Sequence, residues 1–296
     1  MKKQPRGNRG VVLIVVFLCV ALVFAALWGI VSGFSKLMQY SQNATIDHRS
    51  DPEEQENAEP DDLPQEEEVL PKNTFHADGF YEIDGIRYYN GGDFVGVAGV
   101  DVSSYQSDID WKAVHAAGIE FAIVRVGYRG YGTGNLDLDN CFQEHIEGAI
   151  AAGLDVGVYF FSQALNPEEA AEEARYVLEQ IEPYTLQYPI VYDWEEVPSP
   201  ARTDDMNMLM LTSCAQAFCQ VVEDAGYRAS VYFNQAYGYE QLNLVSLKDY
   251  DFWLAEYDPV PSFAYEVQMW QYTNEGVVPG IEGPVDLNIA FQKKSS

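Results

Sequence analysis

The 296-residue chain has few basic residues, few cysteines and few histidines. Seventeen Lys and Arg stand against 46 Asp and Glu, which gives a formal net charge of −29. Because phosphate binding needs a basic face, this balance argues against nucleic acid as a partner. Four cysteines are too few for a disulfide-rich scaffold. The four histidines are scattered and the cysteines show no metal-binding spacing, so we expect neither a metal site nor a cofactor.

The first 50 residues are the basic part of the chain. They carry six Lys or Arg and one acid, and residues 11–31 form one apolar run. As a helix this run would be about 31 Å long, close to the thickness of the hydrocarbon core of a bilayer. Most of the basic residues precede the run, so the positive-inside rule predicts that residues 1–10 are a cytoplasmic tail.

The sequence therefore predicts a single-pass membrane anchor, with everything after residue 31 outside the cell. The alternative is a protein secreted after signal-peptide cleavage. A signal peptide usually has a shorter apolar region, of about 7–15 residues, so we favour the uncleaved anchor.

Residues 32–72 are predicted to be a disordered linker. Within them, residues 51–72 hold ten acids, one lysine and four prolines. Such a segment cannot bury enough apolar surface to fold, and its charges repel one another, so we expect an extended spacer. Residues 73–96 differ, because Asp84-Gly85 lies between two aromatic, alternating segments. This pattern predicts a small β-hairpin packed on the domain that follows.

From residue 96 onward, strand and helix patterns alternate. The chain is 47% apolar and 14% aromatic, which is enough for a sizeable core. Predicted helices cover residues 111–117, 137–152 and 204–225, with another opening at Asn166-Pro167, and they shorten afterwards. The eight predicted strands are residues 96–102, 119–126, 154–161, 189–195, 228–234, 252–256, 267–272 and 285–289.

This order predicts an α/β protein, in which residues 97–296 form an irregular (β/α) TIM-like barrel with reduced helices in its C-terminal part. An open, doubly wound sheet is the alternative. No glycine-rich phosphate loop follows any predicted strand. The phosphate binding that an open, doubly wound sheet usually provides is therefore not indicated, which favours the barrel.

Four acids are predicted to meet at one rim of the barrel. Asp193 and Glu195 alternate at the end of one strand, so their side chains project to the same side. Asp101 ends the first strand, and Asp286 lies in the last. Carboxylates crowded in a partly dry pocket cannot all ionise, so one of them can hold a proton near neutral pH. Glycoside cleavage needs such an acid to protonate the leaving oxygen.

Aromatic residues near the same strand ends favour a sugar as the ligand. Aromatic rings stack on sugar faces, and tyrosine hydroxyl groups add hydrogen bonds. We expect Trp253 and several phenylalanines to fill the core instead. The residues predicted to bind substrate are Tyr159, Phe161, Tyr257, Trp270 and Tyr272.

The motifs of this region, taken together and in order, resemble glycoside hydrolase family 25, the Chalaropsis-type lysozymes. The resemblance covers about residues 96–292, and Ser107 departs from it, because the family often has glycine there. It rests on residues 99–106 (GVDVSSYQ), 121–127 (FAIVRVG), 157–162 (GVYFFS), 193–195 (DWE), 253–257 (WLAEY), 270–273 (WQYT), 280–283 (GIEG) and 285–288 (VDLN).

The resemblance implies a hydrolase that cleaves the β-1,4 bond between N-acetylmuramic acid and N-acetylglucosamine in peptidoglycan glycan strands. By position, Glu195 would be the general acid/base and Asp193 would orient or stabilise the reacting group, while Asp101 and Asp286 would complete the acidic site. A monomeric catalytic domain is expected. The alternatives are a non-catalytic wall-binding module on the same fold, or a glycosidase of another N-acetylated polymer.

Overall fold

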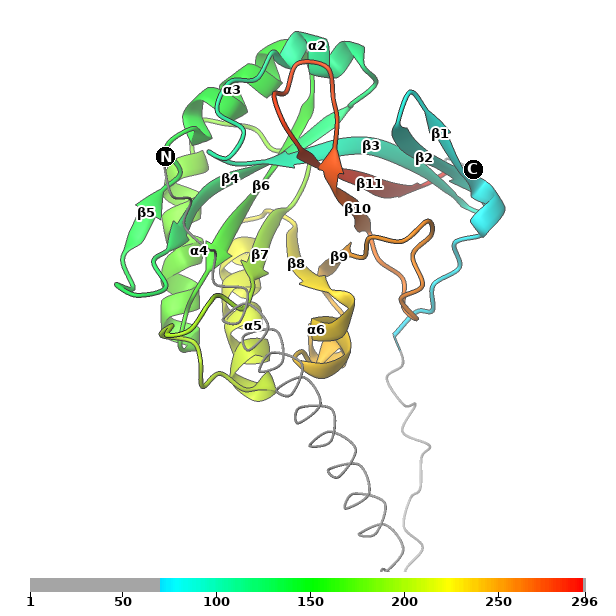
Figure 1. The fold of residues 1–296 in the computed structure, drawn as a ribbon. Helices are drawn as coiled ribbons and strands as arrows, with labels where there is room; N and C mark the ends of the chain where they lie inside the picture. The colour runs from blue at the N-terminus through cyan, green and yellow to red at the C-terminus, as the bar shows by residue number, and fades with distance from the viewer. Residues whose placement is uncertain (1–69, 295–296) are drawn as a thin grey trace, which may run out of the picture. The chain divides into compact units, whose positions relative to one another are not determined.

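Eight strands close into a ring in the computed structural model, which describes residues 70–294 (Figure 1). The predicted cytoplasmic tail, the apolar run and nearly all of the acidic linker lie outside the described residues. Among the helices within residues 70–294, none is long and apolar enough to cross a membrane.

Seven strands of the ring run parallel, and the eighth runs against both of its neighbours. The pairing of β3 with β4 closes the ring, and β11 is antiparallel to β10 and to β3. In spatial order the ring is β3 (Phe94–Val102), β4 (Phe121–Arg129), β6 (Asp155–Ser162), β7 (Ile190–Trp194), β8 (Ala229–Asn234), β9 (Asp251–Ala255), β10 (Met269–Gly276) and β11 (Val285–Lys293).

The antiparallel eighth strand departs from a regular (β/α) repeat, and the reason is the length of its connection. Only residues 277–284 separate β10 from β11. A parallel crossover needs a dozen or more residues, whereas an antiparallel return can be short. As a result, the start of β11 lies at the same rim as the ends of the parallel strands, and Asp286 pairs directly with Asp101.

Four helices connect the first strands and cover the outside of the ring: α2 (Trp111–Ala116), α3 (Phe142–Ala152), α4 (Pro167–Ile181) and α5 (Met208–Asp224) (Figure 1). Only the short helix α6 (Gln235–Glu240) and the 3₁₀ turn η2 (Leu244–Leu247) follow β8, and no helix of the described chain follows β9 or β10. The structure thus confirms a closed barrel with few helices in its C-terminal part.

Two predicted helices begin later than expected. Residues before α3 form β5 (Leu136–Leu138), which pairs antiparallel with β4 and makes a β-hairpin at the rim. The last predicted long helix begins at Met208, where the Asn207 side chain accepts a hydrogen bond from the Met210 backbone N–H. The sequence pattern of helix α3 runs on into β5, so periodicity alone places its start too early.

The predicted hairpin is present before the barrel. A 3₁₀ turn, η1 (Ala77–Gly79), leads into β1 (Phe80–Ile83), which pairs antiparallel with β2 (Ile86–Gly91). Asp84 and Gly85 have φ angles of 52° and 84°, the left-handed conformation that a two-residue hairpin turn requires. Because β2 also pairs with β3, this hairpin continues the barrel sheet.

The core has an outer and an inner part. Most buried apolar residues lie between the sheet and the helices or under the hairpin. A small separate cluster lies inside the ring, formed by Phe121, Ile123, Val191, Trp253, Met269 and Ala290. Phe121 pairs with the first residue of β6, so it lies near the amino ends of the strands. The inner cluster therefore fills the base of the ring, and the opposite rim carries the site.

Candidate active site

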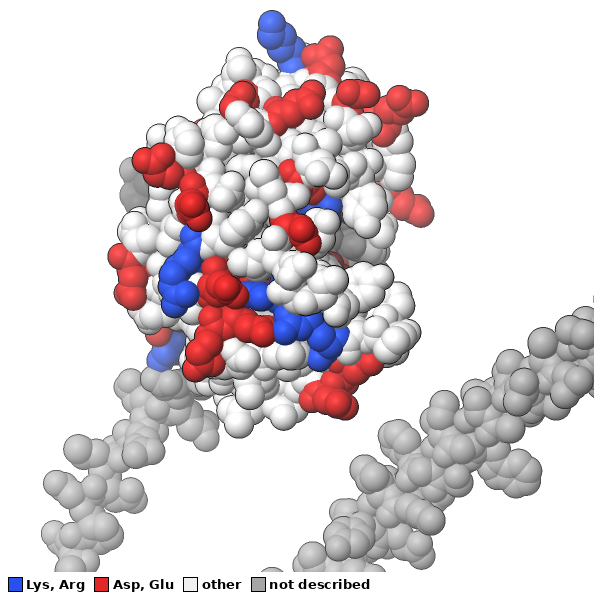
Figure 2. Space-filling model, turned by 90° about the vertical axis from the view of Figure 1, so that its left-hand side faces the viewer, with Lys and Arg blue, Asp and Glu red and all other residues white. Residues whose placement is uncertain are grey.

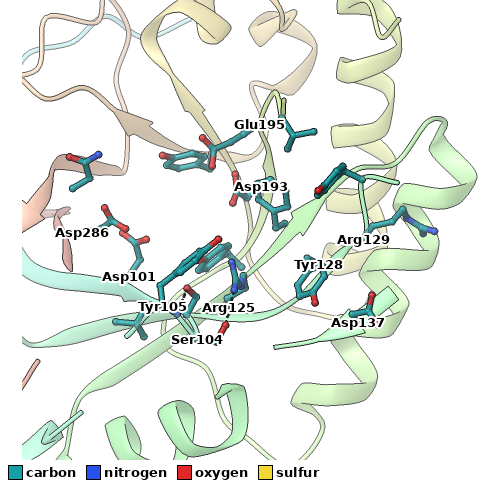
Figure 3. Close-up of a pocket in the computed structure, with 18 of the residues that line it drawn as sticks. Asp101, Ser104, Tyr105, Arg125, Tyr128, Arg129, Asp137, Asp193, Glu195 and Asp286 are labelled. Carbon is teal, nitrogen blue, oxygen red and sulfur yellow. Dashed lines mark hydrogen bonds between the residues drawn. The ribbon is translucent and has the colours of Figure 1, made fainter. Parts of the chain in front are cut away.

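A cleft of about 960 Å³ opens at the carboxyl ends of the parallel strands. Figure 3 shows Asp101, Asp193, Glu195 and Asp286 on opposite sides of its hollow. Seven of the nine predicted site residues line it, namely Asp101, Asp193, Glu195, Asp286, Tyr159, Phe161 and Tyr257. Residues from both ends of the chain are thus brought together, because β3 and β11 are neighbours in the ring.

Asp101 is buried and is held by two amide groups. Its Oδ2 accepts hydrogen bonds from Gln271 Nε2 at 2.8 Å and from Asn288 Nδ2 at 2.7 Å. Burial raises the pKa of Asp101, and the two amide hydrogen bonds partly offset this effect because they stabilise the charged form. The amides therefore favour a negative charge on Asp101 over one on its neighbours.

Asp286 holds the proton of this pair. Burial, the charge of Asp101 and a side-chain hydrogen bond with Asp101 raise the pKa of Asp286 to about 8. Two carboxyl groups this close cannot both ionise readily, so they share one proton, and the amides on Asp101 decide which group carries it.

Asp193 and Glu195 face the cleft from the end of β7. Asp193 is buried, and its Oδ1 has no hydrogen-bond partner among the described residues. Burial, followed by the charge of Glu195, raises the pKa of Asp193 well above its usual value. Burial and the charge of Asp101 raise the pKa of Glu195. The cleft therefore retains protons at neutral pH, as general acid catalysis requires.

The family model "Glycosyl hydrolases family 25" matches residues 100–281, which include three of the four acids. The chain belongs to glycosyl hydrolase family 25. An autolytic lysozyme of Clostridium acetobutylicum is 26% identical over 191 residues, covering 64% of this chain and 54% of the relative. Lysozyme M1 of Streptomyces globisporus is 27% identical over 209 residues, covering 66% of this chain and 68% of the relative.

Solved structures show the same fold. The modular autolysin LytC of Streptococcus pneumoniae, in complex with a synthetic peptidoglycan ligand, superimposes with a TM-score of 0.61 at 27% identity, covering 72% of this chain and 52% of that one. A family 25 glycosyl hydrolase of Bacillus anthracis gives a TM-score of 0.57 at 23% identity, covering 73% and 94%. The chain spans about half the length of the autolytic lysozyme and of LytC.

The family 25 cleft contains an amide that the sequence analysis missed. While Gln271 Nε2 donates to Asp101, its Oε1 accepts hydrogen bonds from the hydroxyl groups of Tyr232 at 3.0 Å and Tyr257 at 2.9 Å. These three contacts fix the orientation of the amide. The alternation of Trp270, Gln271 and Tyr272 along β10 was the available signal, because neighbouring residues of a strand face opposite sides.

The same alternation corrects two predictions, since Trp270 and Tyr272 lie outside the cleft. Trp270 is fully buried, packs edge-on against Phe80 and donates to the Glu256 backbone carbonyl. The Tyr272 hydroxyl accepts a hydrogen bond from the Arg87 backbone N–H, and the Arg87 guanidinium lies 4.8 Å from its ring centroid. Both rings lie on the outer face of β10, beneath the β1–β2 hairpin, where no ligand in the cleft reaches them.

Several other cleft residues were not among the predicted site residues. Trp253, which was expected in the core, is nearly fully buried but also lines the cleft floor, where its Nε1 donates to Asn288 Oδ1 at 2.8 Å. Among residues 70–294, no group of three His, Cys, Asp or Glu side chains is placed to hold a metal ion. The remaining lining side chains that sequence reasoning missed include Tyr105, Arg125, Tyr128, Tyr131 and Tyr232.

Proposed function

We propose that this chain is a peptidoglycan hydrolase that cleaves the β-1,4 bond between N-acetylmuramic acid and N-acetylglucosamine. The observation that carries the proposal is the group of four carboxyl groups with raised pKa values in one cleft. Membership of family 25 and the similarity to two proteins named lysozymes support the same reaction.

In the proposed mechanism, Glu195 is the general acid that protonates the oxygen of the leaving sugar. Burial and the charge of Asp101 raise the pKa of Glu195, which favours its protonated form before the bond breaks. Asp193, on the same face of the strand, orients or stabilises the reacting sugar through the acetamido group of that sugar. The Asp101–Asp286 pair supplies the negative field at the floor of the cleft.

The Glu195→Gln variant tests this assignment. We expect it to release reducing ends from purified peptidoglycan at least about a hundredfold more slowly than the parent, because the amide cannot donate the proton. Thermal unfolding should stay unchanged, since the Glu195 side chain makes no ion pair among the described residues.

The matched control is Glu196→Gln, which changes the next carboxylate. Glu196 is exposed and does not line the cleft, so activity should be retained. Full activity of Glu195→Gln would refute the role of Glu195 as the acid.

The parent chain also decides between the alternative functions. If it binds walls without reducing their turbidity, the chain is a wall-binding module. If it releases reducing ends from chitin but not from peptidoglycan, another polymer is the substrate.

We further propose that residues 11–31 anchor the enzyme in a bacterial membrane with the barrel on the outer side. The length of this apolar run and the basic residues before it support the proposal. The acidic segment of residues 32–72 would then act as a spacer that lets the barrel reach the wall. Secretion after signal cleavage is the competing arrangement.

A further inference from the structure

Exposed tyrosines are concentrated on the cleft. Six tyrosines of the described residues are among the large, exposed apolar side chains, and four of them line the cleft. Of these four, Tyr257 is next to the acids through Gln271. The other three come from two neighbouring segments, the loop after β3 and the β4–β5 hairpin, with exposed fractions of 86% for Tyr105, 37% for Tyr128 and 56% for Tyr131.

These three rings line the side of the cleft that β3 and β4 form, beyond Asp101. Asp101 pairs with Ile123 of β4, and Tyr128 lies five residues further along that strand. At the rise of a β-strand this separation from Asp101 is roughly 16 Å. Tyr128 pairs with Phe161, which pairs with Asp193, so Tyr128 lies two strands away from Asp193. In Figure 3, Tyr105 and Arg125 lie beside Asp101, and Tyr128 lies further along, on the side away from Asp286. The cleft therefore extends along β4 beyond Asp101 and has room beside the acids for sugars that flank the bond that is cut.

Arg125 holds two of the rings in place. Its guanidinium lies 5.4 Å from the ring centroid of Tyr105 and 5.7 Å from that of Tyr128. An ion pair of 2.7 Å fixes Arg125 to the fully buried side chain of Asp139. Asp139 also accepts a hydrogen bond from the Ser104 backbone N–H, which ties down the loop that carries Tyr105. The rings are thus positioned before a ligand arrives, which lowers the entropy cost of binding.

The tip of the β4–β5 hairpin, which carries Tyr131, is also fixed. The Tyr131 carbonyl accepts a hydrogen bond from the Arg202 backbone N–H at 3.0 Å. The Arg202 guanidinium forms an ion pair with Glu169 of α4. Arg129, at the end of β4, donates to the Gly134 carbonyl at 2.8 Å and pairs with two more acids of α4, Glu172 and Glu173. The backbone of Tyr131 is therefore braced against α4 and the loop after β7.

The basic charges at this end of the cleft are paired, whereas Asp137, which also lines it, is exposed and forms no ion pair among the described residues. Arg125, Arg129 and Arg202 each form ion pairs with acids. Figure 2 shows the side of the molecule that carries β5 and α4, where basic and acidic side chains lie next to one another rather than in separate patches. A ligand that fits here has a flat apolar face that can stack on the rings, as the ring of an N-acetylated sugar has.

We propose that Tyr105, Tyr128 and Tyr131 form a second glycan-binding subsite, which holds sugars of the glycan strand beside those at the bond that is cut. The proposal rests on the proposed function, because it assigns the same substrate to a further part of the same cleft. The volume of about 960 Å³ lies at the upper end of the range for small-ligand pockets, about 300 to 1,000 Å³.

The test measures binding of the full chain to glycan strands from which the stem peptides have been removed. The chain carries Glu195→Gln so that the strands stay intact. Adding Tyr131→Ala should weaken binding about three- to tenfold, because one stacked ring is lost, whereas Tyr131→Phe keeps the ring and should bind as the parent does. Tyr81→Ala is the control, because Tyr81 is an equally exposed tyrosine outside the cleft.

A second measurement uses the chain with Glu195 intact. Its kcat/KM should rise as the stem-free strands become longer, and Tyr131→Ala or Tyr105→Ala should flatten this rise, while kcat on long strands stays unchanged.

Three results would overturn the subsite. These are unchanged binding in Tyr131→Ala, an equal loss of kcat/KM on short and long strands, or a loss of binding seen only on strands that still bear stem peptides. The last result would assign the tyrosines to the peptide. A parent chain that cuts no glycan contradicts the proposed function instead, and the binding measurement still decides the subsite.

Discussion

At the scale of single residues, one neutral side chain organises the acidic site. Gln271 donates to Asp101 and accepts from Tyr232 and Tyr257, so it links the first strand of the ring to β8 and to the chain after β9. Since Asp101 raises the pKa values of both Glu195 and Asp286, the amide of Gln271 acts on both of these acids through Asp101.

The Gln271→Leu variant should therefore narrow the pH profile of kcat/KM from both sides. Without the amide donor, the pKa of Asp101 rises, so its charge is lost at a higher pH and the acidic limb moves up. With less negative charge beside it, Glu195 loses its proton at a lower pH, so the basic limb moves down. At the optimum we expect kcat/KM to fall about tenfold.

The control for Gln271→Leu is Gln292→Leu, an exposed glutamine at the opposite end of the barrel, which should leave the profile unchanged. A uniform loss of activity in Gln271→Leu with both limbs of the pH profile unmoved would mean that Gln271 supports only the fold.

The Gln271→Leu variant also leaves two tyrosine hydroxyl groups without their acceptor. This loss should lower the free energy of unfolding by about 1–3 kcal/mol.

At the scale of helices and strands, local sequence signals predicted the order of the elements well. They were less informative about where an element begins or ends and which face of a strand points inward. Asn166 caps α4 and Asp84-Gly85 forms the turn between β1 and β2 as expected, and Asp110 caps α2. The alternation of β10 correctly paired Trp270 with Tyr272, but it does not say which face points inward. That choice depends on the hairpin that covers one face, which is a tertiary contact.

The same distinction holds for the candidate site. Asp193 and Glu195 were predictable because an i, i+2 spacing on one strand fixes their common side. Asp286 could be placed near them only by assuming a closed ring, and its direct pairing with Asp101 follows from the reversed direction of β11. Arg125 and the tyrosines of the rim gave no such signal, since each becomes meaningful only through contacts distant in sequence.

At the scale of the whole molecule, the sequence divides into a basic N-terminal part and an acidic remainder. If residues 11–31 are an anchor, an external protease should degrade the barrel in intact protoplasts while a cytoplasmic marker survives. The barrel should also sediment with membranes and be released by detergent. A barrel found free in the medium with a new N-terminus would instead show cleavage and secretion.

The central claim is that this family 25 barrel hydrolyses the glycosidic bond of N-acetylmuramic acid, with Glu195 as the acid. The most direct measurement is mass analysis of the fragments that the full chain releases from purified peptidoglycan, with the parent and Glu195→Gln compared under the same conditions. We predict fragments with N-acetylmuramic acid at the new reducing end from the parent, and none from the variant. Fragments ending in N-acetylglucosamine, or equal release by the two proteins, would contradict the account.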